Sequence, residues 1–143
     1  MLIYQKNLVK QVLKEMNFDE KESSMLAFVS RAKNMMVSAA EALGAADNFH
    51  DKRLAQVYDA YQRKLRSNNA VDFDDIIMKT VTLLRSNDEV RTKYQRQFEY
   101  VLIDEFQDTN FAQFELAKIL SEGSNKLMVV GDDDQSIYKF RGA

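Results

Sequence analysis

The spacing of apolar side chains changes near residue 100, and this change divides the chain. Before it, apolar residues recur three and four positions apart, which predicts amphipathic helices. Residues 100–103 and 127–130 are instead short continuous apolar runs, as in buried parallel strands. A helical pattern over about residues 111–120 separates them and suits the crossover of a parallel βαβ unit. We therefore predict a mainly α chain: a helical bundle over residues 1–97, followed by a small, truncated α/β part.

Composition agrees with helices and restricts the chemistry. Proline is absent and glycine occurs four times, whereas average usage would give about seven prolines and about ten glycines in this length. With no cysteine and one histidine, the chain cannot build a disulfide framework, a thiolate zinc site or, easily, a serine triad, so any metal must be held by oxygen. Hydrophobic residues at 45% and charged residues at 29% exclude a disordered tail and a membrane protein. No signal peptide is visible, so a cytoplasmic location is expected.

Capping residues and apolar stripes locate the helices. The expected caps are Ser24, Asp72, Asn87 or Asp88, and Thr109 or Asn110. Tyr58 and Tyr61 lie in an apolar stripe, which favours core packing over base stacking. The stripe around Met35 and Met36 predicts core filling, and it leaves Lys33 on the opposite, polar face.

Carboxylates gather where the predicted strands end. The net charge is +2 over residues 1–72 and −4 over residues 73–143. The first apolar run ends in Asp104-Glu105, the Walker B arrangement, in which Asp holds Mg²⁺ and Glu polarises the water that attacks a phosphate. Acids at a strand end are more often ordinary loop residues. Gln107, Asp108 and a second acidic strand end favour the functional interpretation.

The second acidic strand end, residues 131–143, carries polar, aromatic and cationic side chains in alternation. Gln135 carries an uncharged amide, a donor and acceptor that could form a hydrogen bond with a γ-phosphate and so detect it. Tyr138 and Phe140 alternate with Lys139 and Arg141, a pattern typical of single-strand nucleic-acid binding. The alternative is that the two aromatics cover the end of a core while the cations are solvated.

These two strings resemble motifs II and III of the UvrD/Rep/PcrA-type superfamily I DNA helicases. The matching segments are Asp104 to Asn110 and Gly131 to Ala143, and residues 30–34 and 72–77 resemble other segments of the same helicases. The resemblance implies that residues 1–97 are a helical subdomain 1B with its connecting helices. It implies that residues 98–143 are part of a RecA-like, P-loop NTPase motor domain.

The resemblance also implies a role for each matching residue in an ATP-dependent 3′–5′ DNA helicase of DNA repair or replication. Asp104 would bind Mg²⁺, and Glu105 would be the catalytic general base. Gln107 and Asp108 would support the nucleotide site, and Gln135 would contact the γ-phosphate and couple nucleotide state to DNA. The residues implied to lie along single-stranded DNA are Tyr138, Lys139, Phe140 and Arg141.

Subdomain 1B of such helicases sits over the DNA near the duplex junction. A predicted helix carries a basic face that would suit phosphate contact, formed by Lys52, Arg53, Arg63, Lys64 and Arg66. Solvation of this face is an equally good interpretation.

The chain lacks the Walker A loop, Gly-x-x-x-x-Gly-Lys-Ser/Thr, because none of its four glycines precedes a lysine. We therefore expect a fragment of a helicase, inactive without the remaining motor domains that would supply the ATP grip. One alternative is a DNA-binding module of a helicase-nuclease subunit or of a non-catalytic relative. An Mg²⁺ nuclease built on Asp104, Asp108 and residues 132–134 ranks last, because it leaves Gln135 and the aromatic residues unexplained.

Overall fold

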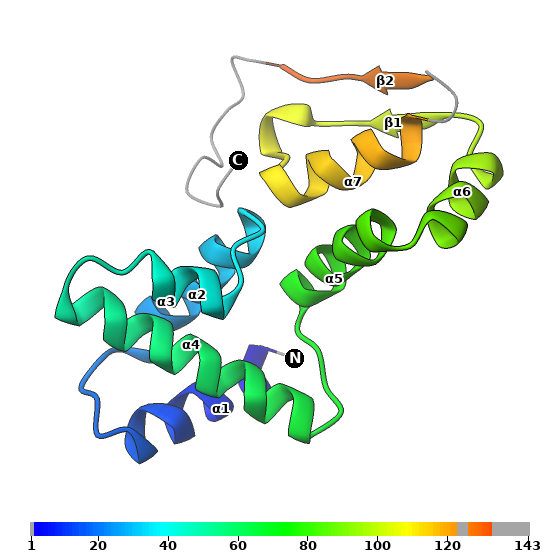
Figure 1. The fold of residues 1–143 in the computed structure, drawn as a ribbon. Coiled ribbons are helices and arrows are strands. Elements are labelled where there is room, and N and C mark those ends of the chain that lie inside the picture. The colour runs from blue at the N-terminus through cyan, green and yellow to red at the C-terminus, as the bar shows by residue number, and fades with distance from the viewer. Residues whose placement is uncertain (1, 123–125, 133–143) are drawn as a thin grey trace. The chain divides into compact units, whose positions relative to one another are not determined.

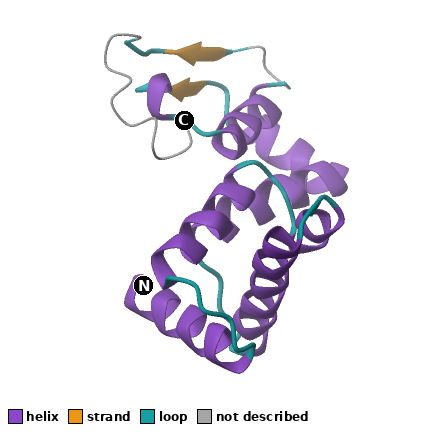
Figure 2. Cartoon of the chain, turned by 90° about the vertical axis from the view of Figure 1, so that its left-hand side faces the viewer, coloured by secondary structure: helices purple, strands orange, loops and turns teal. Residues whose placement is uncertain are grey.

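A computed structural model describes residues 2–122 and 126–132. Helices dominate, and two short strands pair with each other (Figures 1 and 2). The chain divides into two compact units, Met1–Asp75 and Ile76–Ala143. In chain order the elements are α1 (Leu2–Glu15), α2 (Glu22–Asn34), α3 (Ala39–Gly44), α4 (Phe49–Ser67), α5 (Phe73–Ser86), α6 (Asp88–Gln97), β1 (Val101–Ile103), the 3-10 turn η1 (Phe106–Asp108), α7 (Phe111–Ser121) and β2 (Leu127–Val129). The mainly helical composition with a small α/β part is as predicted.

The first unit packs α1, α2, α3 and α4 around one apolar core. Apolar residues three and four apart on each helix supply it, as their spacing predicts. Tyr58 and Tyr61 are 1% and 0% exposed, which confirms that they are core residues. The other large buried side chains of this core are Leu8, Val9, Val12, Leu13, Met25, Val29, Val57 and Leu65.

Two predictions about α2 are wrong. The helix begins at Glu22 after Lys21, not after a Ser24 cap, and no side chain caps it. The acidic Glu22 in the first turn supplies favourable charge at the helix N-terminus instead. Met35 is 53% exposed rather than core filling, because α2 ends at Asn34 and the chain then turns through a left-handed residue, Met36.

Lys33 was expected on the polar face of α2, yet its side chain is fully buried. Its Nζ lies 2.5 Å from Asp72 Oδ2 and 3.1 Å from Asp75 Oδ1. The Tyr61 hydroxyl donates to Asp72 Oδ2 at 3.0 Å, and Gln62 Nε2 donates to Asp75 Oδ1 at 3.0 Å. Burial, and then the negative charge of Asp72, raise the pKa of Tyr61, so the phenol stays a donor. Two carboxylates at the start of α5 thus compensate the buried ammonium, and Tyr61 and Gln62 of α4 hold those carboxylates in turn.

The cap of α5 is confirmed. Asp72 Oδ1 accepts from the Asp75 backbone N–H at 2.8 Å, and the Asp72 N–H donates back to Asp75 Oδ2 at 3.4 Å. The reciprocal pair satisfies backbone donors at the helix start, as in a capping box. The same two carboxylates therefore begin α5 and neutralise Lys33.

The second unit contains the predicted βαβ unit. Strands β1 and β2 are parallel, with Leu102 opposite Met128, and α7 crosses between them along one face (Figure 1). Parallel pairing is confirmed, but the predicted burial of both strands is wrong: Leu102 and Met128 are each 63% exposed. Helix α7 packs against both strands of this sheet.

No helix of the described residues is long and apolar enough to span a membrane.

We predict that Lys33→Met destabilises the chain by about 3–5 kcal/mol, because removing one partner of a buried ion pair leaves the other charge without compensation. The matched control is Lys64→Met. Lys64 pairs with Glu15 at 2.9 Å, but Glu15 is 61% exposed, so the loss should be below about 1 kcal/mol. Urea unfolding followed by circular dichroism measures both. Equal losses in the two variants would contradict the importance of the buried cluster.

Candidate functional site

The polar residues that follow β1 and those that follow β2 meet at one edge of the sheet. Parallel strands end at the same edge, where ligands of open α/β sheets bind. The Val130 N–H donates to the Ile103 carbonyl at 2.8 Å, and the Phe106 N–H donates to the Val130 carbonyl at 3.0 Å. The loop after β1 is therefore hydrogen bonded to the segment after β2.

Glu105 follows the strand in an unusual backbone conformation. Its φ of 51° and ψ of 49° lie in the left-handed region, which costs a non-glycine residue roughly 1–2 kcal/mol. Asp104 Oδ1 accepts from the Glu105 N–H at 2.9 Å. The Asp108 N–H then donates to the Glu105 carbonyl at 2.9 Å, which closes the turn η1. This left-handed residue separates the extended strand from η1 and leaves both acidic residues exposed.

Gln107 connects the two strand ends. Its side-chain Oε1 accepts from the Asp132 backbone N–H at 3.1 Å. The side-chain oxygen of Gln107 is therefore occupied by a hydrogen bond within the protein. The predicted role of Gln107 at a nucleotide remains a prediction.

One carboxylate oxygen of Asp108 has no hydrogen-bond donor among the described residues. This atom, Oδ1, is buried. A buried acceptor without a donor is costly and marks a place where a further donor would be favourable. Asp108 therefore has one acceptor oxygen that a further donor could use, and its predicted role at the nucleotide site remains a prediction.

The described residues form no cluster of three or more metal-ligating side chains. Asp104 is an exposed carboxylate. Mg²⁺ keeps several waters in its coordination shell and is often bound through one or two carboxylates together with substrate phosphates. A single exposed carboxylate is therefore compatible with Mg²⁺ binding. The donor set therefore fits magnesium better than a metal that requires a complete protein cage.

The start of α7 fixes the far end of the loop. Asn110 accepts from the Gln113 N–H at 3.0 Å, and the Asn110 N–H donates to Gln113 Oε1 at 3.1 Å, so the predicted cap is part of a full capping box. Phe106 also contacts Phe114 edge to face, with ring centroids 6.0 Å apart. Sequence reasoning missed Gln113 and Phe114; the Asn-x-x-Gln spacing was the signal for the former.

The other predicted site residues lie outside the described part of the chain. They are Gln135, Tyr138, Lys139, Phe140 and Arg141. Their roles at the γ-phosphate and along single-stranded DNA remain predictions.

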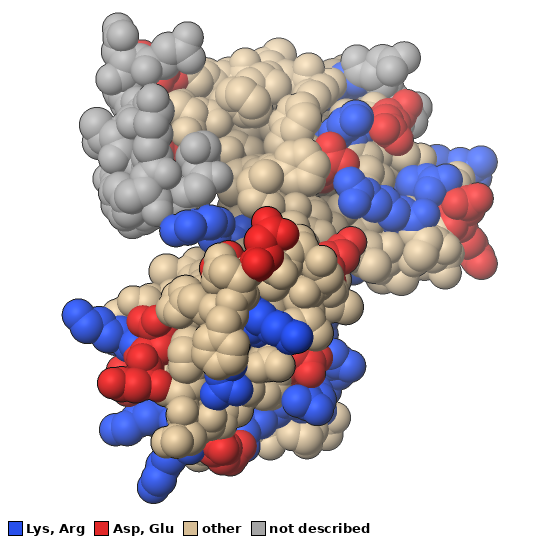
Figure 3. All heavy atoms as spheres, turned by 60° about the vertical axis from the view of Figure 1, so that its left-hand side comes forward, with Lys and Arg blue, Asp and Glu red and all other residues tan. Residues whose placement is uncertain are grey.

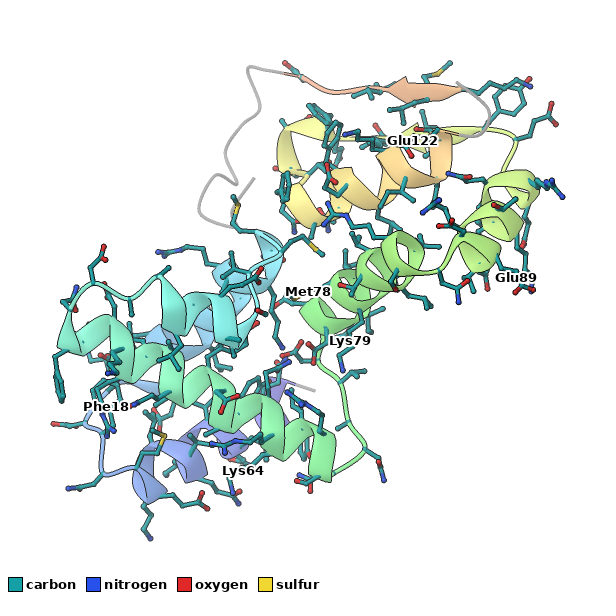
Figure 4. All side chains as sticks on the ribbon, viewed as in Figure 1. Phe18, Lys64, Met78, Lys79, Glu89 and Glu122 are labelled. Atoms are coloured by element: carbon teal, nitrogen blue, oxygen red, sulfur yellow. The ribbon has the colours of Figure 1, made fainter. Side chains whose placement is uncertain are left out.

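The predicted basic face of α4 is largely engaged within the protein. Arg53 donates to the Met16 carbonyl at 2.6 Å, Arg63 pairs with Asp59 at 3.2 Å, and Lys64 pairs with Glu15. Figure 3 shows basic and acidic side chains interspersed rather than one basic patch on this face of the molecule. In Figure 4, Lys64 lies on α4 and Phe18 in the loop after α1.

Comparison with known proteins gives consistent matches. Residues 3–143 match the family described as UvrD/REP helicase N-terminal domain. The chain is 44% identical over 142 residues to the ATP-dependent DNA helicase PcrA of Leuconostoc citreum, covering 97% of this chain and 19% of that protein. It is 45% identical over 142 residues to the protein of the same name from Staphylococcus aureus strain Mu50, covering 97% and 20%. The chain thus spans about a fifth of the length of these relatives.

We predict opposite effects for two substitutions at Glu105. Glu105→Gly should leave stability unchanged or raise it by up to about 1 kcal/mol, because glycine adopts positive φ without steric cost. Glu105→Val should lower it by about 1–3 kcal/mol, because a β-branched residue is strained there. Thermal unfolding of the chain measures both.

The control is the same pair of substitutions at Glu122, which caps the C-terminus of α7 with φ of −56°. Glycine should give no gain there. A glycine variant at residue 105 that is less stable than the valine variant would contradict the left-handed conformation.

Proposed function

Because the chain belongs to the family of the UvrD/REP helicase N-terminal domain, we propose that its parent protein is an ATP-dependent DNA helicase that moves 3′ to 5′ in DNA repair or replication. The observation that carries the proposal is the placement of Asp104 and Glu105 at the carboxyl end of β1, between residues that are hydrogen bonded to the end of β2 and the segment after it: Ile103, Phe106 and Gln107. The names of the relatives, ATP-dependent DNA helicases, support it. A cytoplasmic location accords with this function.

In the proposed site, Asp104 holds Mg²⁺ and Glu105 accepts the proton of the water that attacks the γ-phosphate. When bound, Mg²⁺ would neutralise charge on the ATP phosphates. Asp104 Oδ1 accepts from the Glu105 N–H, so the second carboxylate oxygen of Asp104 is available for the metal. The two carboxylates thereby serve different functions in the proposed site. Gln107 and Asp108 support this arrangement from η1.

The proposed DNA contacts lie further along the chain. Tyr138 and Phe140 would stack on bases of single-stranded DNA, with Lys139 and Arg141 at phosphates and Gln135 relating them to the γ-phosphate. On α4, Lys52 and Arg66 form no ion pair among the described residues, which leaves two cations for contact with duplex-junction DNA.

The chain by itself should hydrolyse no ATP above background. Its 143 residues contain no Walker A loop to fix the phosphates against Asp104 and Glu105. Release of phosphate from Mg-ATP by the purified chain, with and without single-stranded DNA, measures this. The longer parent protein, assayed in parallel, is the positive control. Turnover by the chain alone would contradict the need for a separate phosphate-binding loop.

In the parent protein, Glu105→Gln should reduce DNA-stimulated ATP hydrolysis and unwinding by several orders of magnitude while nucleotide binding persists, because the amide cannot accept the proton but Asp104 is intact. Steady-state turnover and binding of a fluorescent ATP analogue separate the two effects. Glu89→Gln is the matched control, since Glu89 is an exposed residue of α6 (Figure 4). Near-normal hydrolysis by the Glu105 variant would refute the assigned base and favour a DNA-binding module without catalysis.

A further inference from the structure

Gly131 lies where the loop after β1 meets the end of β2. A Cβ atom added at this position would be 2.9 Å from Gln107 Oε1, 3.1 Å from Phe106 Cβ and 3.2 Å from the Phe106 nitrogen. The first distance is too short to persist, but Gln107 Oε1 is the end of a flexible side chain and can move at small cost. The other two contacts require Phe106, including its backbone nitrogen, to move by a few tenths of an ångström. The φ of Gly131 lies outside the left-handed region, so glycine is needed here for space and not for backbone freedom.

Hydrogen bonds lie on both sides of this close approach. The residue before Gly131, Val130, accepts from the Phe106 N–H at 3.0 Å, and the residue after it, Asp132, donates its N–H to Gln107 Oε1 at 3.1 Å. Any side chain at Gly131 would push between two bonds that both join the same segments. The two hydrogen bonds therefore depend on the absence of a side chain at Gly131, and we treat them together with the close approach as one contact.

The contact lies beside Glu105. Phe106 follows Glu105 directly, and the Asp108 N–H and the Asp104 carboxylate bind the backbone on its two sides. A displacement of Phe106 by a few tenths of an ångström moves the peptide that Glu105 shares with it. Because the left-handed conformation of Glu105 is unfavourable on its own, the surrounding contacts must maintain it.

We infer that Gly131 is a positioning residue: the absence of its side chain lets Gln107 and Phe106 dock on the end of β2, and this docking holds Glu105 in its left-handed conformation for proton abstraction. This inference rests on the proposed function, in which Glu105 is the general base. The inference also gives Gln107 a positioning role, because its side-chain oxygen accepts from the Asp132 N–H in the same contact.

The test uses the full-length parent protein and a double-mutant cycle of Gly131→Ala and Gln107→Ala. The matched control is Gly44→Ala, because a Cβ at Gly44 would meet nothing within 4 Å among the described residues. Each variant is measured for kcat and KM of DNA-stimulated ATP hydrolysis and for Tm. A further variant, Gln107→Glu, retains an oxygen acceptor of the same length, whereas Gln107→Leu retains only the shape.

We expect Gly131→Ala to lower kcat by about tenfold to a hundredfold with KM for ATP changed less than about twofold, because a small misplacement of a catalytic group affects the chemical step more than binding. In the Gln107→Ala background the same change should lower kcat by a clearly smaller factor, since the closest clash is gone and only the two contacts with Phe106 remain. The Tm losses should show the same non-additivity. Gln107→Glu should keep more activity than Gln107→Leu, and Gly44→Ala should match the unsubstituted protein in kcat and KM, with a Tm that is not lowered.

Several results would overturn the inference. Additive effects on Tm would show that Gly131 and Gln107 do not share one contact. Coupled Tm values with an unchanged kcat would show that the contact is structural and does not position Glu105. If the unsubstituted parent hydrolysed no ATP, the proposed function would fail and the catalytic part of the inference with it, while the Tm cycle would still decide whether the contact exists.

Discussion

Burial of the Lys33 ammonium is the constraint on which the first unit depends. A fully buried ammonium is tolerated only with compensating charge, and Asp72 and Asp75 supply it at 2.5 and 3.1 Å. These carboxylates also accept from Tyr61 and Gln62 of α4, so one cluster joins α2, α4 and the first turn of α5. The apolar core of this unit favours packing of the helices in general, whereas the cluster specifies which residues must meet.

The second unit uses a different device to bring distant residues together. Parallel pairing of β1 and β2 places two strand ends at one edge, although they lie more than twenty residues apart in the sequence. The capping box at Asn110 then fixes where α7 begins, and Phe106 packs on Phe114. The short loop between β1 and α7, which carries Asp104 and Glu105, is therefore held at both ends.

Periodicity and capping chemistry predicted the parts of the fold that depend on local sequence: the helical stripes, the caps at Asp72 and Asn110, and the parallel strands. They failed where a tertiary contact prevails over the pattern. Lys33 lies on the polar side of its helix by sequence, yet paired acids from a distant segment make its burial favourable. The left-handed conformation of Glu105 could not be predicted from the sequence Asp-Glu, because glutamate does not favour positive φ. The pairing of Gln107 with the Asp132 N–H likewise depends on register across the sheet.

Helix α5 belongs to both units, because its first three residues fall in one and the rest in the other. A hydrogen-bonded helix propagates order along its own backbone, so the two units share a cooperative segment even where their side chains act separately. Loss of the Asp72 cap would expose the amide protons of the first turn of α5, such as that of Asp75, to solvent exchange. The first turn of α5 therefore opens with the first unit, although the remaining residues of the helix belong to the second.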